Sequence, residues 1–302
     1  MLKTFRGVIT ASVTPFQQDR DVDGGAMAAL MRYYEEHGLC GAFICSSSGE
    51  YYAMTDFQRE SAVRSAVKAG TNLTVLAQIS ADRADEAILR AKRMADAGAD
   101  AVVAQPPRFL DYTPDELYRF FTEIADKASV PLLLYNHLMR LNNKLMLPLL
   151  KRLSVHENIF ALKDTHNDAE RMRTIAGDLP GMLVYAGGDA LAGVAASNGA
   201  YLLNALSAIA PEAMCALFAA GQRGDVETVN RIQAMINDLS NIFRMIPTET
   251  PSITSFSGSL RAVLHRRGLV GMQCAQYGVD ISSEQIDSIS SFAEQCCLQW
   301  KD

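Results

Sequence analysis

The sequence lacks any apolar run that approaches the length of a membrane span, so it predicts no transmembrane helix and no membrane partner. The opening segment, Met1–Gly7, lacks the hydrophobic stretch of a secretory signal peptide. Six cysteines are present, yet none forms a C-x-x-C pair or stands at zinc-ligand spacing with a histidine. We therefore expect reduced, mostly buried thiols in a cytoplasmic protein.

The sequence also has no surplus of basic residues, with 28 Lys and Arg against 34 Asp and Glu and a net charge of −6. Binding to nucleic acid needs a positively charged face that neutralises phosphates, so this composition argues against a nucleic-acid partner. The five histidines are scattered and no H-E-x-x-H motif occurs. The sequence thus predicts no metal site.

What the sequence does contain is a regular alternation of short apolar runs with amphipathic segments. The predicted strands are Gly7–Val13, Gly41–Ser46, Thr74–Ser80, Ala101–Pro106, Pro131–Asn136, Phe160–Thr165, Met182–Gly187 and Tyr201–Ser207. The predicted helices between them include Gly25–His37, Asp56–Lys68, Ala84–Ala97, Asp115–Lys127 and Asn143–Arg152. Thr55 and Thr113 have the spacing of capping-box residues, and Gly38, Gly70 and Gly98 stand where helices end.

Eight strands that alternate with helices over about 220 residues predict an α/β fold, a (β/α)8 TIM barrel. The alternative, an open doubly wound sheet, is weakened because no G-x-G-x-x-G turn follows the first strand. From about Pro211 the chain looks entirely helical, in the segments Glu212–Gln222, Val226–Met245, Ile253–Arg266 and Glu284–Gln299. We expect a catalytic barrel over residues 1–224 and a C-terminal helical appendage over residues 225–302.

Reactive side chains of such barrels stand at the carboxyl ends of the strands, and Lys163 ends one of them. Alternation with Ala161 directs Lys163 into the barrel, where loss of hydration lowers the pKa of an amine and makes it a nucleophile towards ketones. The plainer interpretation is a structural salt bridge to Asp164 or Glu50. Tyr135 ends the preceding strand, so its phenol should lie beside Lys163 and could transfer protons. A tyrosine bound only to backbone is the alternative there.

The turn Ser47-Ser48-Gly49-Glu50 follows the second predicted strand. Its backbone N–H groups and two hydroxyls could hold a carboxylate. Loops of serine and glycine are common, so the turn alone does not indicate a binding site. It becomes informative if the substrate is a keto acid, because the carboxylate of such a substrate must be bound.

At these positions the chain resembles the dihydrodipicolinate synthase / N-acetylneuraminate lyase family of pyruvate-type class I lyases. The resemblance runs from about Gly7 to at least Pro211. The motifs that carry it are Gly7-Val8-Ile9-Thr10-Ala11-Ser12-Val13-Thr14-Pro15-Phe16, Ser47-Ser48-Gly49-Glu50, Tyr135-Asn136 followed by Arg140, Leu162-Lys163-Asp164, and Ala186-Gly187-Gly188-Asp189. Five modest motifs in the correct order on the correct strands make a specific match.

The resemblance implies a Schiff base between Lys163 and the keto carbon of a 2-oxo acid, with no cofactor. It further implies that Tyr135 relays protons with the hydroxyl of Ser47, and that Ser47 and Ser48 bind the substrate carboxylate. Arg140 would contact the distal end of the substrate and Gly187 would contribute a backbone contact. A homotetramer, or a dimer of that type, is the implied assembly.

Departures from the family pattern bear on specificity. The Pro-Tyr-Tyr of dihydrodipicolinate synthase is Pro107-Arg108-Phe109 here, so a phenyl group replaces the second phenol of the relay. Asn204 is a further expected change in the substrate pocket. His137, His166 and Arg108 near the mouth favour a polar or anionic substrate tail, although ordinary solvated loop residues would look the same.

The leading hypothesis is a lyase, either an aldolase or a dehydratase, acting on a 4-hydroxy-2-oxo acid such as a 2-keto-3-deoxy sugar acid. One alternative is a dihydrodipicolinate synthase that condenses pyruvate with aspartate semialdehyde through a rearranged relay. The other is a non-catalytic barrel that binds 2-oxo acids. Retention of Lys163, Tyr135 and Arg140 together argues against the last.

Overall fold

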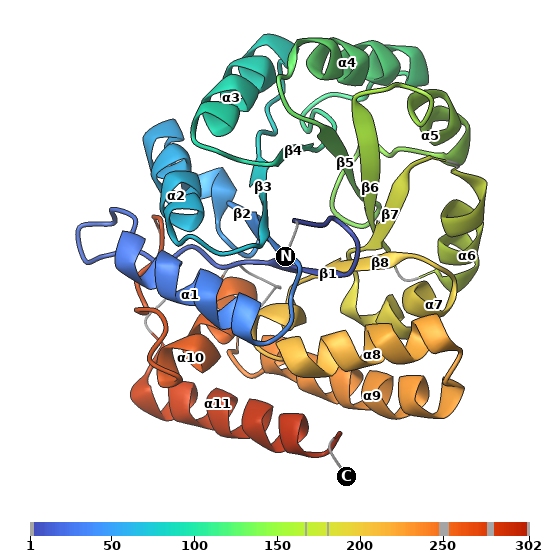
Figure 1. Cartoon of the computed structure of the whole chain (residues 1–302). Helices are drawn as coiled ribbons and strands as arrows, with labels where there is room; N and C mark the ends of the chain where they lie inside the picture. Colours follow the sequence, from blue (N-terminus) through green and yellow to red (C-terminus); the bar gives the residue numbers. More distant parts are fainter. Residues whose placement is uncertain (1–2, 167, 180, 248–253, 277–280, 301–302) are drawn as a thin grey trace.

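Eight parallel strands close into a barrel in the order β1 to β8, with β8 pairing back onto β1 (Figure 1). The computed structural model describes residues 3–166, 168–179, 181–247, 254–276 and 281–300. The strands are β1 (Val8–Ala11), β2 (Gly41–Ile44), β3 (Thr74–Gln78), β4 (Ala101–Ala104), β5 (Leu132–His137), β6 (Ile159–Thr165), β7 (Leu183–Ala186) and β8 (Tyr201–Asn204). The predicted (β/α)8 barrel is therefore confirmed.

Helices cover the outside of the strands and form an outer ring (Figure 1). They are α1 (Gly24–Glu36), α2 (Asp56–Lys68), α3 (Ala84–Asp96), α4 (Pro114–Lys127), α5 (Leu147–Leu153), α6 (Ala169–Asp178), α7 (Ala192–Ser197) and α8 (Pro211–Arg223). Capping boxes at Thr55 and Thr113 start α2 and α4 as predicted. Gly38, Gly70 and Gly98 have positive φ angles after three helices, as the sequence predicts.

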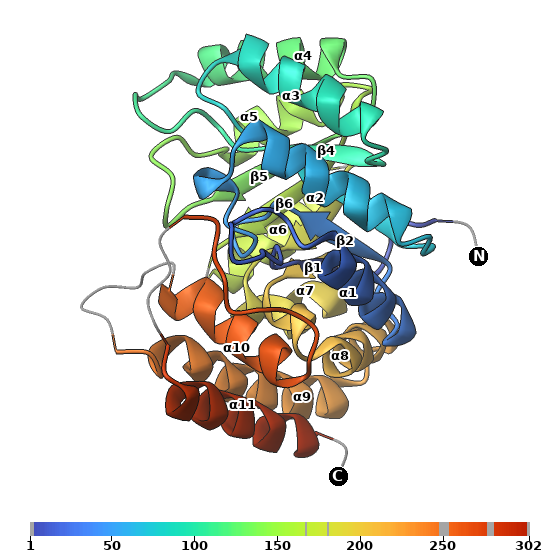
Figure 2. The ribbon, with the colours of Figure 1, turned by 90° about the vertical axis from the view of Figure 1, so that its left-hand side faces the viewer.

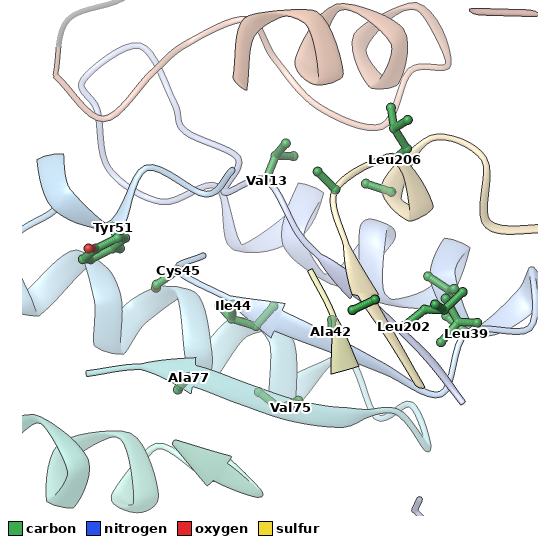
Figure 3. Packing of buried hydrophobic residues seen from close by; sticks show 14 of the residues in the cluster. Val13, Leu39, Ala42, Ile44, Cys45, Tyr51, Val75, Ala77, Leu202 and Leu206 are labelled. Atoms are coloured by element: carbon green, nitrogen blue, oxygen red, sulfur yellow. The ribbon is translucent and has the colours of Figure 1, made fainter. Parts of the chain in front are cut away.

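The strands bury side chains on both faces. Alternate residues point into the barrel and form one cluster: Ile9, Ala11, Phe43, Leu76, Ala101, Val103, Leu133, Tyr135, Ala161, Tyr185 and Leu203. Their neighbours, such as Ile44, Val75 and Ala77, point outward and pack under the helices (Figure 3). This two-sided burial explains why the strands read as nearly continuous apolar runs.

One helix of the barrel starts later than the sequence predicts. The expected helix Asn143–Arg152 is α5, which begins only at Leu147. The Asn143 amide nitrogen donates to the carbonyls of Pro107 and Leu110, and its oxygen accepts from the Tyr112 N–H. These bonds hold the segment as a loop, because an asparagine side chain that binds backbone groups competes with helix formation.

The C-terminal helices lie along one side of the barrel, next to α1 and α8 (Figure 2). They are α9 (Val226–Leu239), α10 (Ser259–Arg266) and α11 (Ser283–Leu298). The predicted helix Val226–Met245 ends at Leu239 and continues as a 3-10 turn, Ser240–Arg244. The predicted helix Ile253–Arg266 contains a π-helical turn, Thr254–Gly258, before α10; Ile253 itself lies outside the described residues. In the part of the chain that is described, no helix combines the length and apolarity of a membrane span.

A buried ion pair fastens α10 to the barrel. Arg261 on α10 donates to Glu50 over 2.6 Å, and both side chains are fully buried. Arg261 also donates to the carbonyl of Thr14, while the other carboxylate oxygen of Glu50 accepts from the Ala275 N–H. The carboxylate predicted as a possible partner of Lys163 is therefore engaged by an arginine from the C-terminal region.

Candidate active site

A cavity of about 200 Å³ opens at the carboxyl ends of the strands. Its lining residues are Ala11, Ser47, Ser48, Tyr135, His137, Met139, Arg140, Lys163, Thr165, Gly187, Gly188, Asp189, Ala205 and Phe256. A larger hollow of about 540 Å³ between α1, α8 and α11 lies away from the strand ends, and no lysine is found among its described lining residues. The reactive groups thus gather in the smaller cavity.

Lys163 lies at the base of this cavity, with its side chain almost fully buried. It pairs in register with Tyr135 across β5 and β6. Its Nζ is 4.4 Å from the centre of the Tyr135 ring and 5.4 Å from that of Phe43. Burial lowers the pKa of Lys163 to about 7, and the charge of Asp189 partly opposes this shift. A substantial fraction of the amine is therefore neutral near neutral pH.

The two carboxylates that could have formed a structural salt bridge with Lys163 have other partners. Asp164 points away from the cavity and binds Arg171 at 2.7 Å and the imidazole of His166. Glu50 binds Arg261, as described above. Neither forms an ion pair with Lys163, so the amine is held among aromatic rings instead.

The phenol of Tyr135 is buried beside this amine. Burial raises the pKa of Tyr135 above its usual value, while the neighbouring hydroxyls of Ser47 and Thr165 partly oppose the shift. The phenol therefore stays protonated at neutral pH. The face of its ring lies against the Lys163 amine, and its hydroxyl is hydrogen-bonded to Ser47.

The loop after β2 brings Ser47 and Ser48 to the cavity. It can pass close to β1 only because its third residue is a glycine: a Cβ on Gly49 would lie 2.8 Å from Thr14 Oγ1 and 2.9 Å from the Ser12 carbonyl oxygen. The Thr14 hydroxyl donates to the Gly49 carbonyl at 2.9 Å. The two serines are thereby fixed opposite the end of β6.

The turn after β7 completes the site. The Gly187 N–H donates to the Asp164 carbonyl, and a Cβ on Gly187 would lie 1.9 Å from Thr165 Oγ1 and 2.7 Å from Lys163 Cε. Asp189, which sequence reasoning did not assign to the site, accepts from the Leu206 N–H at 3.1 Å. Burial raises the pKa of Asp189 to about 6, and Lys163 partly opposes this. Its position just after a strand end was the signal that could have identified it.

Arg140 and His137 also line the cavity, on the rim after β5. The Arg140 guanidinium lies 5.8 Å from the ring centre of Phe256. Phe256 was missed by sequence reasoning because it comes from the π-helical turn before α10, some 90 residues beyond Lys163. Thr165, also missed, stands two residues after Lys163 on the same face of β6.

Two residues predicted for substrate binding are not in the cavity of this chain. The Phe109 side chain is 86% exposed, on the loop between β4 and α4. Asn204 is fully buried but follows the inward-facing Leu203, so it points outward, and its amide lies 3.4 Å from Met214 Sδ on α8.

Two of the three polar residues predicted near the mouth also lie elsewhere. His166 binds Asp164 and the Asp168 carbonyl, so it stabilises the start of α6. Arg108 contacts Asp82 at the loop surface. Only His137 of this group reaches the cavity.

Replacing Gly187 with alanine should lower kcat/KM roughly 100-fold, because the added methyl group must displace Lys163 and Thr165 by about an ångström. Steady-state kinetics with any 2-oxo acid that the wild type converts would measure this loss of kcat/KM. Gly177→Ala is the matched control, since a Cβ there meets nothing within 4 Å. Equal kcat/KM values for the two variants would show that the close approach of Gly187 to Lys163 and Thr165 is not needed for catalysis.

The barrel and its site define the class of the protein: a buried amine of lowered pKa beside a phenol, at the mouth of a (β/α)8 barrel, is the arrangement of a class I lyase that forms a Schiff base. The chain belongs to the dihydrodipicolinate synthetase family, whose sequence model matches residues 4–295. This confirms the family predicted from the five motifs.

Named relatives and solved structures agree with this family. The chain is 30% identical to N-acetylneuraminate lyase of Rhizobium meliloti over 76% of this chain and 78% of that protein. It is 27% identical to 4-hydroxy-tetrahydrodipicolinate synthase of Thermodesulfovibrio yellowstonii over 78% of this chain and 82% of that one. The dihydrodipicolinate synthase of Acinetobacter baumannii, solved with pyruvate, superposes with a TM-score of 0.86 at 25% identity, covering 97% of this chain and 99% of that one.

Proposed function

We propose that the protein is a lyase in which Lys163 forms a Schiff base with C2 of a 4-hydroxy-2-oxo acid, such as a 2-keto-3-deoxy sugar acid. The observation that carries this proposal is the buried amine of Lys163, whose pKa is lowered to about 7, in contact with the ring of Tyr135. An uncharged amine adds to a ketone, and the resulting iminium withdraws electrons from C3.

The proposed reaction begins when the neutral amine attacks the C2 carbonyl. Tyr135 delivers a proton to the departing hydroxyl, and water leaves to give the iminium. In an aldolase the Tyr135 phenolate then takes the proton of the C4 hydroxyl, the C3–C4 bond breaks, C4 leaves as an aldehyde, and the electron pair of the broken bond forms an enamine with C2. In a dehydratase a C3 proton is removed and a hydroxyl group is expelled. In both cases the iminium nitrogen takes up the electron pair.

The remaining groups of the cavity hold the substrate. Ser47 and Ser48 supply hydroxyls and backbone N–H groups for the carboxylate next to the keto carbon. Arg140, on the opposite rim, contacts the distal end of the substrate. The backbone of Gly187 approaches the substrate closely, because no side chain intervenes. Support for these roles comes from the shared cavity that all four residues line.

The rate of adduct formation should follow the neutral fraction of Lys163. Because burial lowers the pKa of Lys163 to about 7, the rate should fall about tenfold per pH unit below that value and level off above pH 8. Asp189→Asn removes a charge that raises this pKa, so the midpoint should move to lower pH. The rate at which the borohydride-trapped adduct forms, measured from pH 5 to about pH 11, tests both predictions. A midpoint near 10 would mean that the amine is not desolvated.

A substrate screen separates the possible reactions. Incubation with 2-keto-3-deoxy acids should release either pyruvate, from an aldolase, or an ultraviolet-absorbing dehydration product. Condensation of pyruvate with aspartate semialdehyde, improved by Phe109→Tyr, would instead identify a dihydrodipicolinate synthase. Measurable binding without turnover of any 2-oxo acid would indicate the non-catalytic barrel.

We also propose a homotetramer, or a dimer of the same type, located in the cytoplasm; sedimentation equilibrium would establish the assembly. Residues 225–302 belong to the same catalytic unit as the barrel of residues 1–224. Support for this comes from Phe256, which lines the cavity, and from the buried pair of Arg261 with Glu50.

A further inference from the structure

Phe43 is a second aromatic neighbour of the Lys163 amine, and the proposed reaction gives it no role. It stands on β2 and points into the barrel, where its side chain is fully buried. The Nζ of Lys163 lies over its ring, 5.4 Å from the ring centre, and over the ring of Tyr135 at 4.4 Å. The two rings meet edge to face, at an angle of 83° and a distance of 6.3 Å between their centres. The amine is therefore flanked by two aromatic rings.

These rings are the contacts that the structure offers to a charge on Nζ. Among the residues that the structure describes, none forms a hydrogen bond or an ion pair with Lys163, and Asp189 acts on it through its charge alone. The face of an aromatic ring is electron-rich, so it attracts a cation but has little effect on a neutral amine. The rings thus favour the charged state of Nζ over the neutral one.

The strands beside Phe43 offer no competing polar group at the same level. In the register of the sheet, Phe43 stands opposite Ala11 on β1 and Leu76 on β3. All three residues belong to the apolar cluster inside the barrel and are buried. Neither neighbour carries a side-chain oxygen or nitrogen. The ring of Phe43 is therefore the group through which this side of the barrel wall acts on the amine.

A positive charge appears on Nζ during the proposed reaction and then disappears. The lone pair of the neutral amine forms the bond to C2. The carbonyl oxygen leaves as water, with one proton from the amine and one from Tyr135, and Nζ remains as the nitrogen of a cationic iminium. In the next step the electron pair released at C3 moves towards Nζ and neutralises it. A group that attracts the cation more than the neutral amine accelerates the step that creates the charge.

We infer that Phe43 is a catalytic residue whose ring face stabilises the cationic iminium on Lys163 and the transition state that leads to it. This role rests on the proposed Schiff base and adds to it a residue that exchanges no proton. A cation over an aromatic ring in a desolvated site is favoured about 5- to 30-fold over the same group without charge. The contribution of Phe43 should lie in that range.

The pH selects the state of the amine with which the iminium is compared. Burial lowers the pKa of Lys163 to about 7. At pH 9 the free amine is neutral, so forming the iminium creates a charge over the ring. At pH 5.5 the free amine is already a cation, and the ring stabilises reactant and product alike. The effect of the ring should therefore be large at pH 9 and should nearly cancel at pH 5.5, whereas an effect of packing would be the same at both.

Other titratable groups around Lys163 do not disturb this comparison. The pKa of Asp189 is raised by burial to about 6, so this carboxyl changes its charge between the two pH values. His137 stays neutral at both, because burial lowers its pKa to about 4. The Tyr135 phenol stays protonated. Since the variant and the wild type are compared at one pH at a time, the state of these groups is the same in both.

The test replaces Phe43 alone with 3,4,5-trifluorophenylalanine, introduced by nonsense suppression, because fluorine withdraws electrons from the ring face with little change in ring size. A rapid borohydride quench over a range of pyruvate concentrations gives the equilibrium constant for the iminium. This constant should fall about 5- to 30-fold at pH 9 and less than about twofold at pH 5.5. The monofluorinated ring should lie between. The same replacement of Phe121, which is buried on α4 outside the barrel wall, is the matched control and should change neither value.

The outcomes separate the role of Phe43 from the Schiff base itself. A wild-type chain that forms the pyruvate adduct, with an equilibrium constant that fluorination leaves unchanged at pH 9, would overturn the role of Phe43 alone. An equal fall at both pH values would overturn it too, since it would show an effect of packing. No adduct in the wild type at either pH would remove the proposed function and this role with it. Phe43→Leu, which keeps an apolar side chain without a ring, should show the same dependence on pH and tests the role if the fluorinated chain does not fold.

Discussion

Replacing Lys163 with methionine or alanine should abolish turnover, by roughly 10⁴-fold or more, while the barrel stays folded. The loss is this large because no other group in the described cavity can form the iminium: the only other basic side chains lining it are Arg140 and His137. Methionine keeps most of the contacts with the rings of Phe43 and Tyr135. Steady-state rates and circular dichroism on the same samples measure both parts of the prediction.

The stability of the methionine variant gives an independent check. Because the pKa of Lys163 is about 7 in the folded protein and near 10.5 when exposed, the unfolded chain binds the proton more tightly. The free energy of unfolding of the wild type should therefore rise with pH between about 7 and 10.5, and this rise should be absent in Lys163→Met. Near-wild-type turnover in the variant would rule out the covalent mechanism.

The second large effect concerns stability. Arg261→Met should lower the free energy of unfolding by about 3–5 kcal/mol, because it leaves the fully buried carboxylate of Glu50 without its charged partner. Activity should fall as well, since Glu50 follows directly on the Ser47–Gly49 turn that lines the cavity. Urea unfolding at pH 7 measures the first effect.

Arg266→Met on the same helix is the matched control. Arg266 pairs with Asp287 at 3.5 Å, and both side chains are more than half exposed, so its loss should cost less than about 1 kcal/mol. Equal destabilisation by the two substitutions would show that the buried pair does not anchor α10 to the barrel.

The barrel and the core of the site were predictable because they depend on short-range periodicity. Counting alternate residues from Ala161 places Lys163 inside the barrel, and parallel pairing of adjacent strands brings Tyr135 beside it. The same count from Leu203 directs Asn204 outward. The assignment of Asn204 to the pocket came from the family motif instead, and in this chain the residue lies on the outer face of β8, near Met214.

The rest of the site depends on loops and on distant segments, which periodicity does not describe. Phe109 lies in the loop after β4, whose path no alternation rule fixes, and its side chain projects to the surface of this chain. Phe256 reaches the cavity from the turn before α10, a helix that the Arg261–Glu50 pair fastens to the barrel. Such contacts are set by packing between elements far apart in the sequence.

The most direct measurement is borohydride reduction in the presence of pyruvate, followed by peptide mass spectrometry. A neutral, buried amine beside Tyr135 should give one stable adduct, on the peptide that contains Lys163, and none in Lys163→Met. An unlabelled wild-type chain, or a label on any other lysine, would contradict the Schiff-base mechanism.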